Sequence, residues 1–128
     1  MSPRPVGFRG RRIVVADEDK AVVGLVIGAL LAEGHAVFYA YDGLSAFQLA
    51  LGLKVCDLLI SNTRVGGAVG IDLILELREH LPQLAILYLS SSSRSTPELE
   101  ERLPPNVPIL REPFSADKLL AAVRYLLP

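Results

Sequence analysis

Residues 57–62 read DLLISN, an almost unbroken apolar run that ends on an amide side chain, Asn62. Successive apolar residues over a strand of this length are typical of a parallel sheet that helices cover on both faces. On both sides of this run, apolar runs of strand length alternate with runs of helical period. The alternation predicts successive βα units around a parallel sheet.

We expect five such units in one domain. The predicted strands span residues 12–16, 35–41, 57–62, 85–90 and 107–111, and the predicted helices span residues 20–33, 44–53, 71–81, 97–103 and 115–127. The glycine-rich stretch 66–70 is interpreted as a flexible loop. A basic tail over residues 1–11 precedes the domain, which we assign to residues 12–128.

The bulk composition limits the function classes. A chain of 128 residues that is 51% hydrophobic fits one packed domain, and a net charge of −1 gives no overall field toward nucleic acid or an anionic membrane. Cys56 is the only cysteine, which excludes an internal disulfide and, with two histidines, makes a zinc site unfavourable. The longest uncharged helical stretch, residues 21–32, is far shorter than the about twenty residues of a membrane span. No signal peptide is visible, so we expect a cytoplasmic protein.

The basic N-terminal tail is open to two interpretations. Arg4, Arg9, Arg11 and Arg12 stand near its prolines without an acidic neighbour. The segment is either a solvated end of the chain or a weak contact site for a partner.

Polar side chains follow four of the five predicted strands. Because the carboxyl ends of parallel strands meet at one edge of a sheet, we expect these side chains to form the functional edge. They are Asp17 and Glu18 after the first strand, Asn62, Thr63 and Arg64 after the third, Ser90 after the fourth, and Arg111, Glu112, Pro113 and Phe114 after the fifth.

Four motifs occur in the order found in one protein family. They are residues 13–19 (IVVADED), 56–70 (CDLLISNTRVGGAVG), 85–91 (AILYLSS) and 112–114 (EPF). Together they resemble response-regulator receiver (CheY-like) domains from about residue 12 to residue 127. The resemblance implies the flavodoxin-like (βα)5 three-layer fold, with a five-stranded parallel sheet of order 2-1-3-4-5.

The resemblance also implies a role for each position. In receivers, an acidic pair and an acceptor aspartate hold Mg²⁺, the acceptor takes a phosphoryl group from a histidine kinase, and a hydroxyl and a lysine contact the phosphoryl oxygens. Asp17 and Glu18 match the acidic pair, Ser90 matches the hydroxyl, and Pro113 matches a proline that usually follows a cis peptide bond. Asn62 falls on the acceptor position, Glu112 on the lysine position, and Ile109 where the family often has a switching aromatic residue.

Two of these matches oppose phosphorylation. A carboxamide is a very poor nucleophile, so Asn62 cannot form the acyl phosphate. Glu112 reverses a charge beside the expected phosphoryl oxygens, and unit charges about 4 Å apart interact by roughly 4 kcal/mol at an effective dielectric near 20. The sequence therefore predicts a degenerate receiver, or pseudo-receiver, of two-component phosphorelay signalling. We expect it to have no catalytic activity and no required cofactor, with at most weak Mg²⁺ binding, and to act by contact with a histidine kinase or another signalling protein.

Three further interpretations stay open. In the first, Arg64 or Arg111 pairs with Asp17, Glu18 or Glu112 in place of the metal; its alternative is that both arginines are ordinary solvated charges. In the second, the chain is a working phospho-receiver that uses Mg²⁺ and another acceptor, such as Asp17, or has an autophosphatase-like activity. In the third, the chain is a structural scaffold that retains only the fold.

The first predicted helix is apolar on every side from residue 21 to residue 32. A surface helix normally has a polar outer face. We therefore expect a homodimer or partner interface, whose alternative is deep packing under neighbouring helices. The candidate interface residues are Val23, Gly24, Ile27, Gly28, Leu31, Val123 and Leu127.

Overall fold

The computed structural model describes residues 10–128. The elements are β1 (Arg12–Ala16), α1 (Lys20–Ala32), β2 (Ala36–Ala40), α2 (Gly43–Gly52), β3 (Leu58–Asn62), β4 (Arg64–Val65), β5 (Ala68–Val69), α3 (Gly70–His80), β6 (Ala85–Ser90), α4 (Pro97–Glu100), β7 (Ile109–Arg111) and α5 (Ala116–Leu126). Residues 1–9, most of the predicted basic tail, lie outside the described residues. Arg11 is joined to the domain, since its backbone N–H donates to His35 Nδ1 at 3.0 Å and its guanidinium donates to the Pro128 carbonyl at 3.0 Å.

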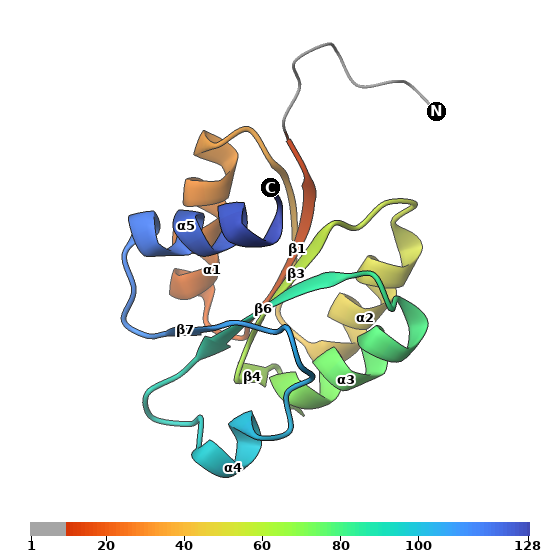
Figure 1. Cartoon of the computed structure of the whole chain (residues 1–128), viewed down its shortest axis with the longest axis vertical. Helices are drawn as coiled ribbons and strands as arrows, with labels where there is room; N and C mark the ends of the chain where they lie inside the picture. Colours follow the sequence, from red (N-terminus) through yellow and green to blue (C-terminus); the bar gives the residue numbers. More distant parts are fainter. Residues whose placement is uncertain (1–9) are drawn as a thin grey trace.

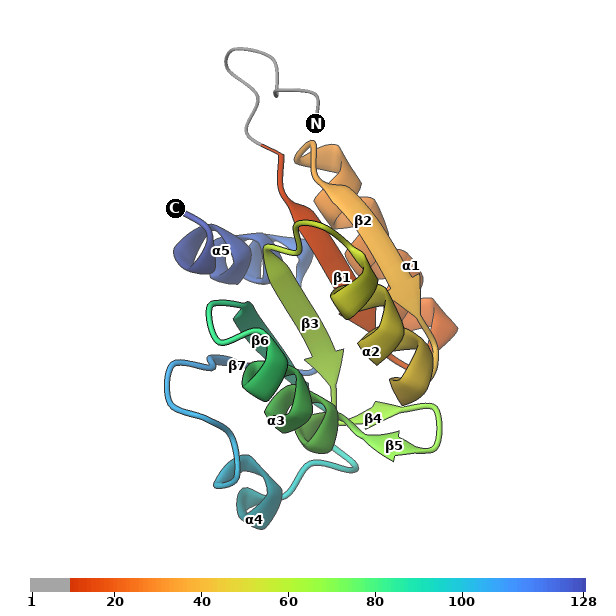
Figure 2. The ribbon, with the colours of Figure 1, turned by 90° about the vertical axis from the view of Figure 1, so that its right-hand side faces the viewer.

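Five parallel strands form one sheet in the order β2-β1-β3-β6-β7 (Figure 2). Numbered among themselves, these strands have the predicted order 2-1-3-4-5, so the fold class is confirmed. The central strand β3 pairs with β1 on one side and with β6 on the other, where Asn62 lies beside Leu89. Every residue of β3 is buried, as its apolar run predicts.

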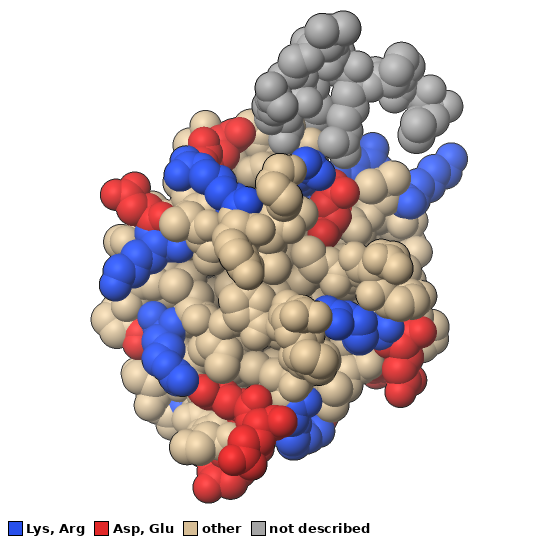
Figure 3. All heavy atoms as spheres, in the orientation of Figure 1, with Lys and Arg blue, Asp and Glu red and all other residues tan. Residues whose placement is uncertain are grey.

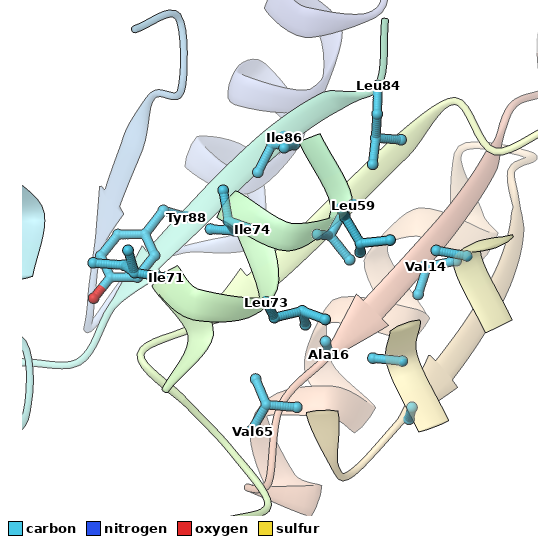
Figure 4. Close-up of a cluster of buried hydrophobic side chains, with 14 residues drawn as sticks. Val14, Ala16, Leu59, Val65, Ile71, Leu73, Ile74, Leu84, Ile86 and Tyr88 are labelled. Atoms are coloured by element: carbon cyan, nitrogen blue, oxygen red, sulfur yellow. The ribbon is translucent and has the colours of Figure 1, made fainter. Parts of the chain in front are cut away.

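Helices cover both faces of this sheet. α1 and α5 lie on one face, and α2 and α3 lie on the other (Figures 1 and 2). Successive residues of a strand point to opposite faces, so each strand contributes to two cores. Val14, Leu59 and Ile86 pack under α2 and α3 (Figure 4), whereas Ile13 and Leu58 pack under α1 and α5.

Short polar side chains begin four helices. Asp19 Oδ1 accepts hydrogen bonds from the backbone N–H groups of Ala21 and Val22, and Asp42 Oδ1 accepts from Ser45. The hydroxyls of Thr96 and Ser115 accept in the same way at α4 and α5. Each cap satisfies backbone donors that the first helical turn leaves free, and so fixes where the chain leaves the site edge.

The predicted loop over residues 66–70 is wrong. Arg64–Val65 and Ala68–Val69 form an antiparallel hairpin, and Gly70 already begins α3. Gly66 and Gly67 form the two-residue turn with φ of 37° and 75°, a conformation that glycine adopts without a steric penalty. The glycine pair therefore orders this connection. The predicted short helix 97–103 and last strand 107–111 are also longer than the observed α4 and β7.

Charged side chains of both signs are interspersed over the face seen in Figure 3. None of the helices in residues 10–128 is long and apolar enough to cross a membrane.

Gly70 provides a test of how tightly β3 is held against α3. A Cβ on Gly70 would lie 1.7 Å from the backbone oxygen of Asn62, whereas a Cβ on Gly24, within α1, would meet no atom within 4 Å. We expect Gly70→Ala to lower the free energy of unfolding by about 3 kcal/mol, near the upper end for overpacking. Gly24→Ala should raise it by about 0.5–1 kcal/mol, because alanine favours a helix more than glycine does. Urea unfolding followed by circular dichroism measures both, and equal effects of the two variants would contradict the close approach.

Candidate functional site

The carboxyl ends of β1, β3 and β6 bring together four buried polar residues. Asp17 follows β1, Asn62 ends β3 with Thr63 directly after it, and Ser90 ends β6. Each of these four residues is at most 5% exposed. Glu112, after β7, is partly buried beside them. The structure thus confirms that residues from separate strands meet at this edge of the sheet.

The Asn62 amide lies between two carboxylates. Its Nδ2 donates to Asp17 Oδ2 at 2.6 Å and to Glu112 Oε1 at 3.4 Å. Its Oδ1 accepts the backbone N–H of Thr63 at 2.6 Å. Both ends of the amide are therefore engaged, and its two N–H hydrogens are divided between two acids.

The two carboxylates are electrostatically unfavourable where they lie. Burial raises the pKa of Asp17, and the neighbouring charges of Asp19 and Glu18 raise it further, against hydrogen bonds from Asp19 and Asn62 that lower it. Burial also raises the pKa of Glu112, and the charge of Asp17 adds to this effect. No ion pair within residues 10–128 joins an arginine or lysine to either carboxylate. The Asn62 amide is the side-chain donor that the two acids share.

The predicted arginine partners of these acids are wrong. Arg111 forms its ion pair with Glu100 of α4, at 2.9 Å. Arg64 forms no ion pair within the described chain, and contributes its backbone carbonyl, which accepts the Glu18 N–H at 3.4 Å. Glu18 pairs instead with Arg94, at 2.9 Å, a residue that the sequence analysis did not single out. This contact spans 76 positions, so no local spacing could have indicated it.

A second hydrogen-bond network holds the Ser90 hydroxyl. Ser90 Oγ donates to Glu100 Oε2 at 2.8 Å, and Arg111 approaches the same hydroxyl at 3.3 Å. Ser95 Oγ donates to Glu100 Oε2 at 2.7 Å and contacts the Tyr88 hydroxyl at 2.8 Å. The Arg111 guanidinium lowers the pKa of the Glu100 carboxyl, aided by these hydroxyls. Ser90 is therefore tied to α4, and Glu100 is a site residue that sequence analysis missed.

A cleft of about 210 Å³ opens over the acidic residues. Four acids and two arginines are among the residues that line it. The lining residues are Asp17, Glu18, Asp19, Asn62, Arg64, Ser91, Ser93, Arg94 and Glu112.

Comparison with solved structures gives close matches to this arrangement of strands and helices. The signal receiver domain of an HD domain-containing protein from Pseudomonas fluorescens Pf-5 superposes with a TM-score of 0.81 at 22% identity, over 93% of this chain and 88% of that chain. The chemotaxis protein CheY4 of Vibrio cholerae gives 0.80 at 21% identity, over 92% and 99% of the two chains. A response regulator from Thermotoga maritima gives 0.77 at 25% identity, over 92% and 98%. The chain has the fold of a response-regulator receiver domain.

Sequence comparison gives relatives at a similar level of identity. The chain is 23% identical over 113 residues to the transcriptional regulatory protein DltR of Streptococcus agalactiae, which covers 88% of the chain. The chain spans about half the length of the curated relatives it matches. No protein-family model matches it.

The structure also places two further residues that the resemblance singled out. The peptide bond between Glu112 and Pro113 is cis. Ile109, at the switching-aromatic position, lies on β7 and is 37% exposed.

The side chains at this site do not fit the Mg²⁺ ion that receiver domains hold. Asp17 Oδ2 accepts a hydrogen bond from the Asn62 amide, and the Glu18 carboxylate is paired with Arg94. An amide N–H group is a donor and cannot coordinate a cation. Within residues 10–128 no three acidic, histidine or cysteine side chains form a group able to hold a metal ion.

Two predicted interface residues belong to the core. Val23 and Val123 are each 1% exposed and pack between α1, α5 and the sheet. Their helical positions face inward, so their assignment to a surface was wrong. Gly24, Gly28 and Leu31 are exposed, whereas Ile27 and Leu127 are partly buried.

Glu112→Gln tests the repulsion within the site. A carboxyl group with a raised pKa binds its proton more tightly in the folded state, so the free energy of unfolding falls as pH rises through the interval between the ordinary and raised values. The variant removes this loss, and we expect its melting temperature at neutral pH to be higher by a few degrees. The difference should vanish as pH falls below 4.5, the ordinary value. Glu79→Gln, exposed on α3, is the matched control. A Glu112→Gln variant that is less stable at neutral pH would contradict the repulsion.

Glu100→Gln should respond to pH in the opposite direction. The lowered pKa of Glu100 means that its charged form stabilises the folded state above 4.5, and this contribution is lost as pH falls through the lowered value. The variant should melt below the wild type at neutral pH, and the two curves should converge in acid. Melting followed by circular dichroism from neutral pH to about pH 3 measures the effect. Glu98→Gln, exposed on the same helix, should leave the curve unchanged.

Proposed function

We propose that this chain is a receiver domain of two-component signalling that takes no phosphoryl group at position 62 and acts by protein–protein contact. The observation that supports this most directly is the Asn62 amide, which donates to Asp17 at 2.6 Å and to Glu112 at 3.4 Å. An acceptor in this position needs a free carboxylate oxygen as nucleophile. Here the side chain offers an N–H group toward the acids instead.

The surrounding charges support the same proposal. A transferred phosphoryl group carries negative charge that a phosphoryl-transfer site must neutralise. Asp17 and Glu112 place two acids beside this position, and burial raises the pKa of both, with a further rise from neighbouring acids. Arg111 is paired with Glu100 and Arg94 with Glu18, so two nearby cations are occupied.

Asp17 is unfavourable as a substitute acceptor. It is 1% exposed, and its two oxygens accept the Asn62 amide and the Asp19 N–H. A nucleophile must reach its donor and must be free of such bonds at the moment of attack. Signalling through a partner, a histidine kinase or another signalling protein, then depends on the surface of the domain.

Incubation with a small phosphodonor and Mg²⁺, followed by intact-mass measurement, tests the proposal. We expect no added phosphoryl mass on the wild type. Asn62→Asp combined with Glu112→Lys restores a nucleophile and a countercharge, and should gain one phosphoryl group. The same double variant with Ser90→Ala is a control for a site that also uses the hydroxyl.

Phosphorylation of the wild type at any aspartate, located by peptide mass spectrometry, would contradict the proposal and favour a working receiver with another acceptor. A double variant that folds but gains no phosphoryl group would show that more of the site than these two positions has diverged. In that case a protein that retains only the receiver fold as a scaffold is the better description.

A further inference from the structure

One edge of the molecule is almost free of charge. Residues 20–53 contain only three of the chain's 13 Lys and Arg and 14 Asp and Glu residues, namely Lys20, Glu33 and Asp42. This segment builds α1, β2 and α2, which lie together at one edge of the sheet, with α1 and α2 on opposite faces of β2 (Figure 2). We call this surface the α1–β2–α2 edge.

Large apolar side chains are exposed along this edge. Leu25 and Leu31 of α1 are 51% and 56% exposed, and Tyr39 of β2 is 51% exposed. On α2, Leu44 is 68% and Leu51 is 38% exposed. Scattered apolar residues are normal on a surface, but a continuous group of them marks an interaction site.

The backbone of β2 also has free hydrogen-bonding groups. Within the described residues β2 pairs only with β1. The Ala36 N–H donates to Arg11 at 2.9 Å, and the Ala40 carbonyl accepts from Asp17 at 3.2 Å, so alternate residues of β2 face β1. Because successive residues of a strand point their backbone groups to opposite sides, those of Val37 and Tyr39 point outward.

We propose that two copies of this chain associate through the α1–β2–α2 edge, related by a two-fold axis, with their β2 strands paired antiparallel about Phe38. Val37 of one copy then lies opposite Tyr39 of the other. Each of these two pairs exchanges two backbone hydrogen bonds, so all the outward groups of both residues are satisfied. The sheet becomes continuous through both copies. This association does not depend on the function proposed above.

A second copy fits this edge better than another occupant because every part of it is self-complementary. A two-fold interface places each surface against its own equivalent, so charges of one sign would repel. The three charged side chains present already have partners within the chain: Lys20 lies over the Tyr41 ring, Glu33 pairs with Arg124, and Asp42 accepts from the Ser45 N–H and hydroxyl.

The two helices give a further reason. Pairing of β2 strands brings α1 toward the partner's α1 on one face and α2 toward the partner's α2 on the other. α2 has no charged residue and α1 has none after Lys20, and Gly24 and Gly28 leave open space on α1 for close approach. An extended peptide added to β2 would satisfy the strand and leave both helices uncovered.

Sedimentation velocity of the full chain over a range of concentrations tests the association. We expect a dimer whose dissociation constant rises at least tenfold in Tyr39→Lys, because the two symmetry-related lysines are diagonal neighbours across the paired strands and repel each other. Tyr125→Lys is the matched control, since Tyr125 is 79% exposed on α5 and is not part of the edge. Circular dichroism of both variants verifies that the fold is intact.

Cross-linking tests the strand register. In the Cys56→Ala background, Phe38→Cys should form an intermolecular disulfide, because residues that face each other in a non-hydrogen-bonded antiparallel pair have Cα atoms about 4.5 Å apart. Ala36→Cys should not, since its opposite residue is Ala40 and its own copy lies about 13 Å away along the strand. Tyr39→Lys tests the same edge without changing Phe38, which packs in the core.

Three results would overturn the proposal. If the wild-type chain is monomeric at every concentration, a second copy does not bind the α1–β2–α2 edge. A vesicle or a peptide would then be the better occupant of this edge. If Tyr125→Lys weakens the dimer and Tyr39→Lys does not, the interface between the two copies lies elsewhere on the surface. A dimer that cross-links through Ala36→Cys and not through Phe38→Cys has a different strand register.

Discussion

The arrangement at the site depends on the pairing of β3, which pairs with β6 along its whole length and with β1 as far as Ser61. β1 and β6 flank it, and all five of its residues are buried. A buried strand with two neighbours cannot shift its register without moving apolar side chains from one face to the other. Asn62 is the last residue of this strand, and α3 begins so close to it that only glycine fits at position 70. The side chain at position 62 therefore has one place and a narrow choice of directions.

Two separate hydrogen-bond systems result from that placement. One joins Asn62 to Asp17 and Glu112, and the other joins Ser90 to Glu100 and Arg111. Thr63 lies between them, accepting from the Tyr88 hydroxyl and from the Ser91 N–H. The hydroxyl that matches the receiver's phosphoryl contact thus belongs to the system that fixes α4, and the amide at the acceptor position belongs to the acidic system. The receiver fold is retained while the two functional groups serve different neighbours.

The sequence predicted what depends on local pattern. Apolar runs located β1, β3 and β6, and the ordered motifs brought Asp17, Asn62, Ser90 and Glu112 to one edge. What it missed depends on long-range contacts: Arg94 reaches Glu18 across 76 positions, and Glu100 holds Ser90 from a helix of four residues. The hairpin at Gly66 and Gly67 was missed for another reason, because glycine is favoured both in tight turns and in flexible linkers. Helical periodicity marked the apolar sides of α1 and α5, but it did not separate the buried Val23 from the exposed Leu31.

Asn62 and Glu112 are best understood as one coupled change. A carboxylate at position 62 would place three acids around one point, and each close pair of like charges costs about 4 kcal/mol at 4 Å and an effective dielectric near 20. An amide has the same shape, carries no charge, and offers two N–H groups, one for each remaining acid. Lysine at position 112 would place a cation against the Asn62 N–H group, so the amide would lose an acceptor and Asp17 would gain a countercharge. The glutamate is therefore tolerated because position 62 holds a donor, and the amide is satisfied because position 112 holds an acceptor.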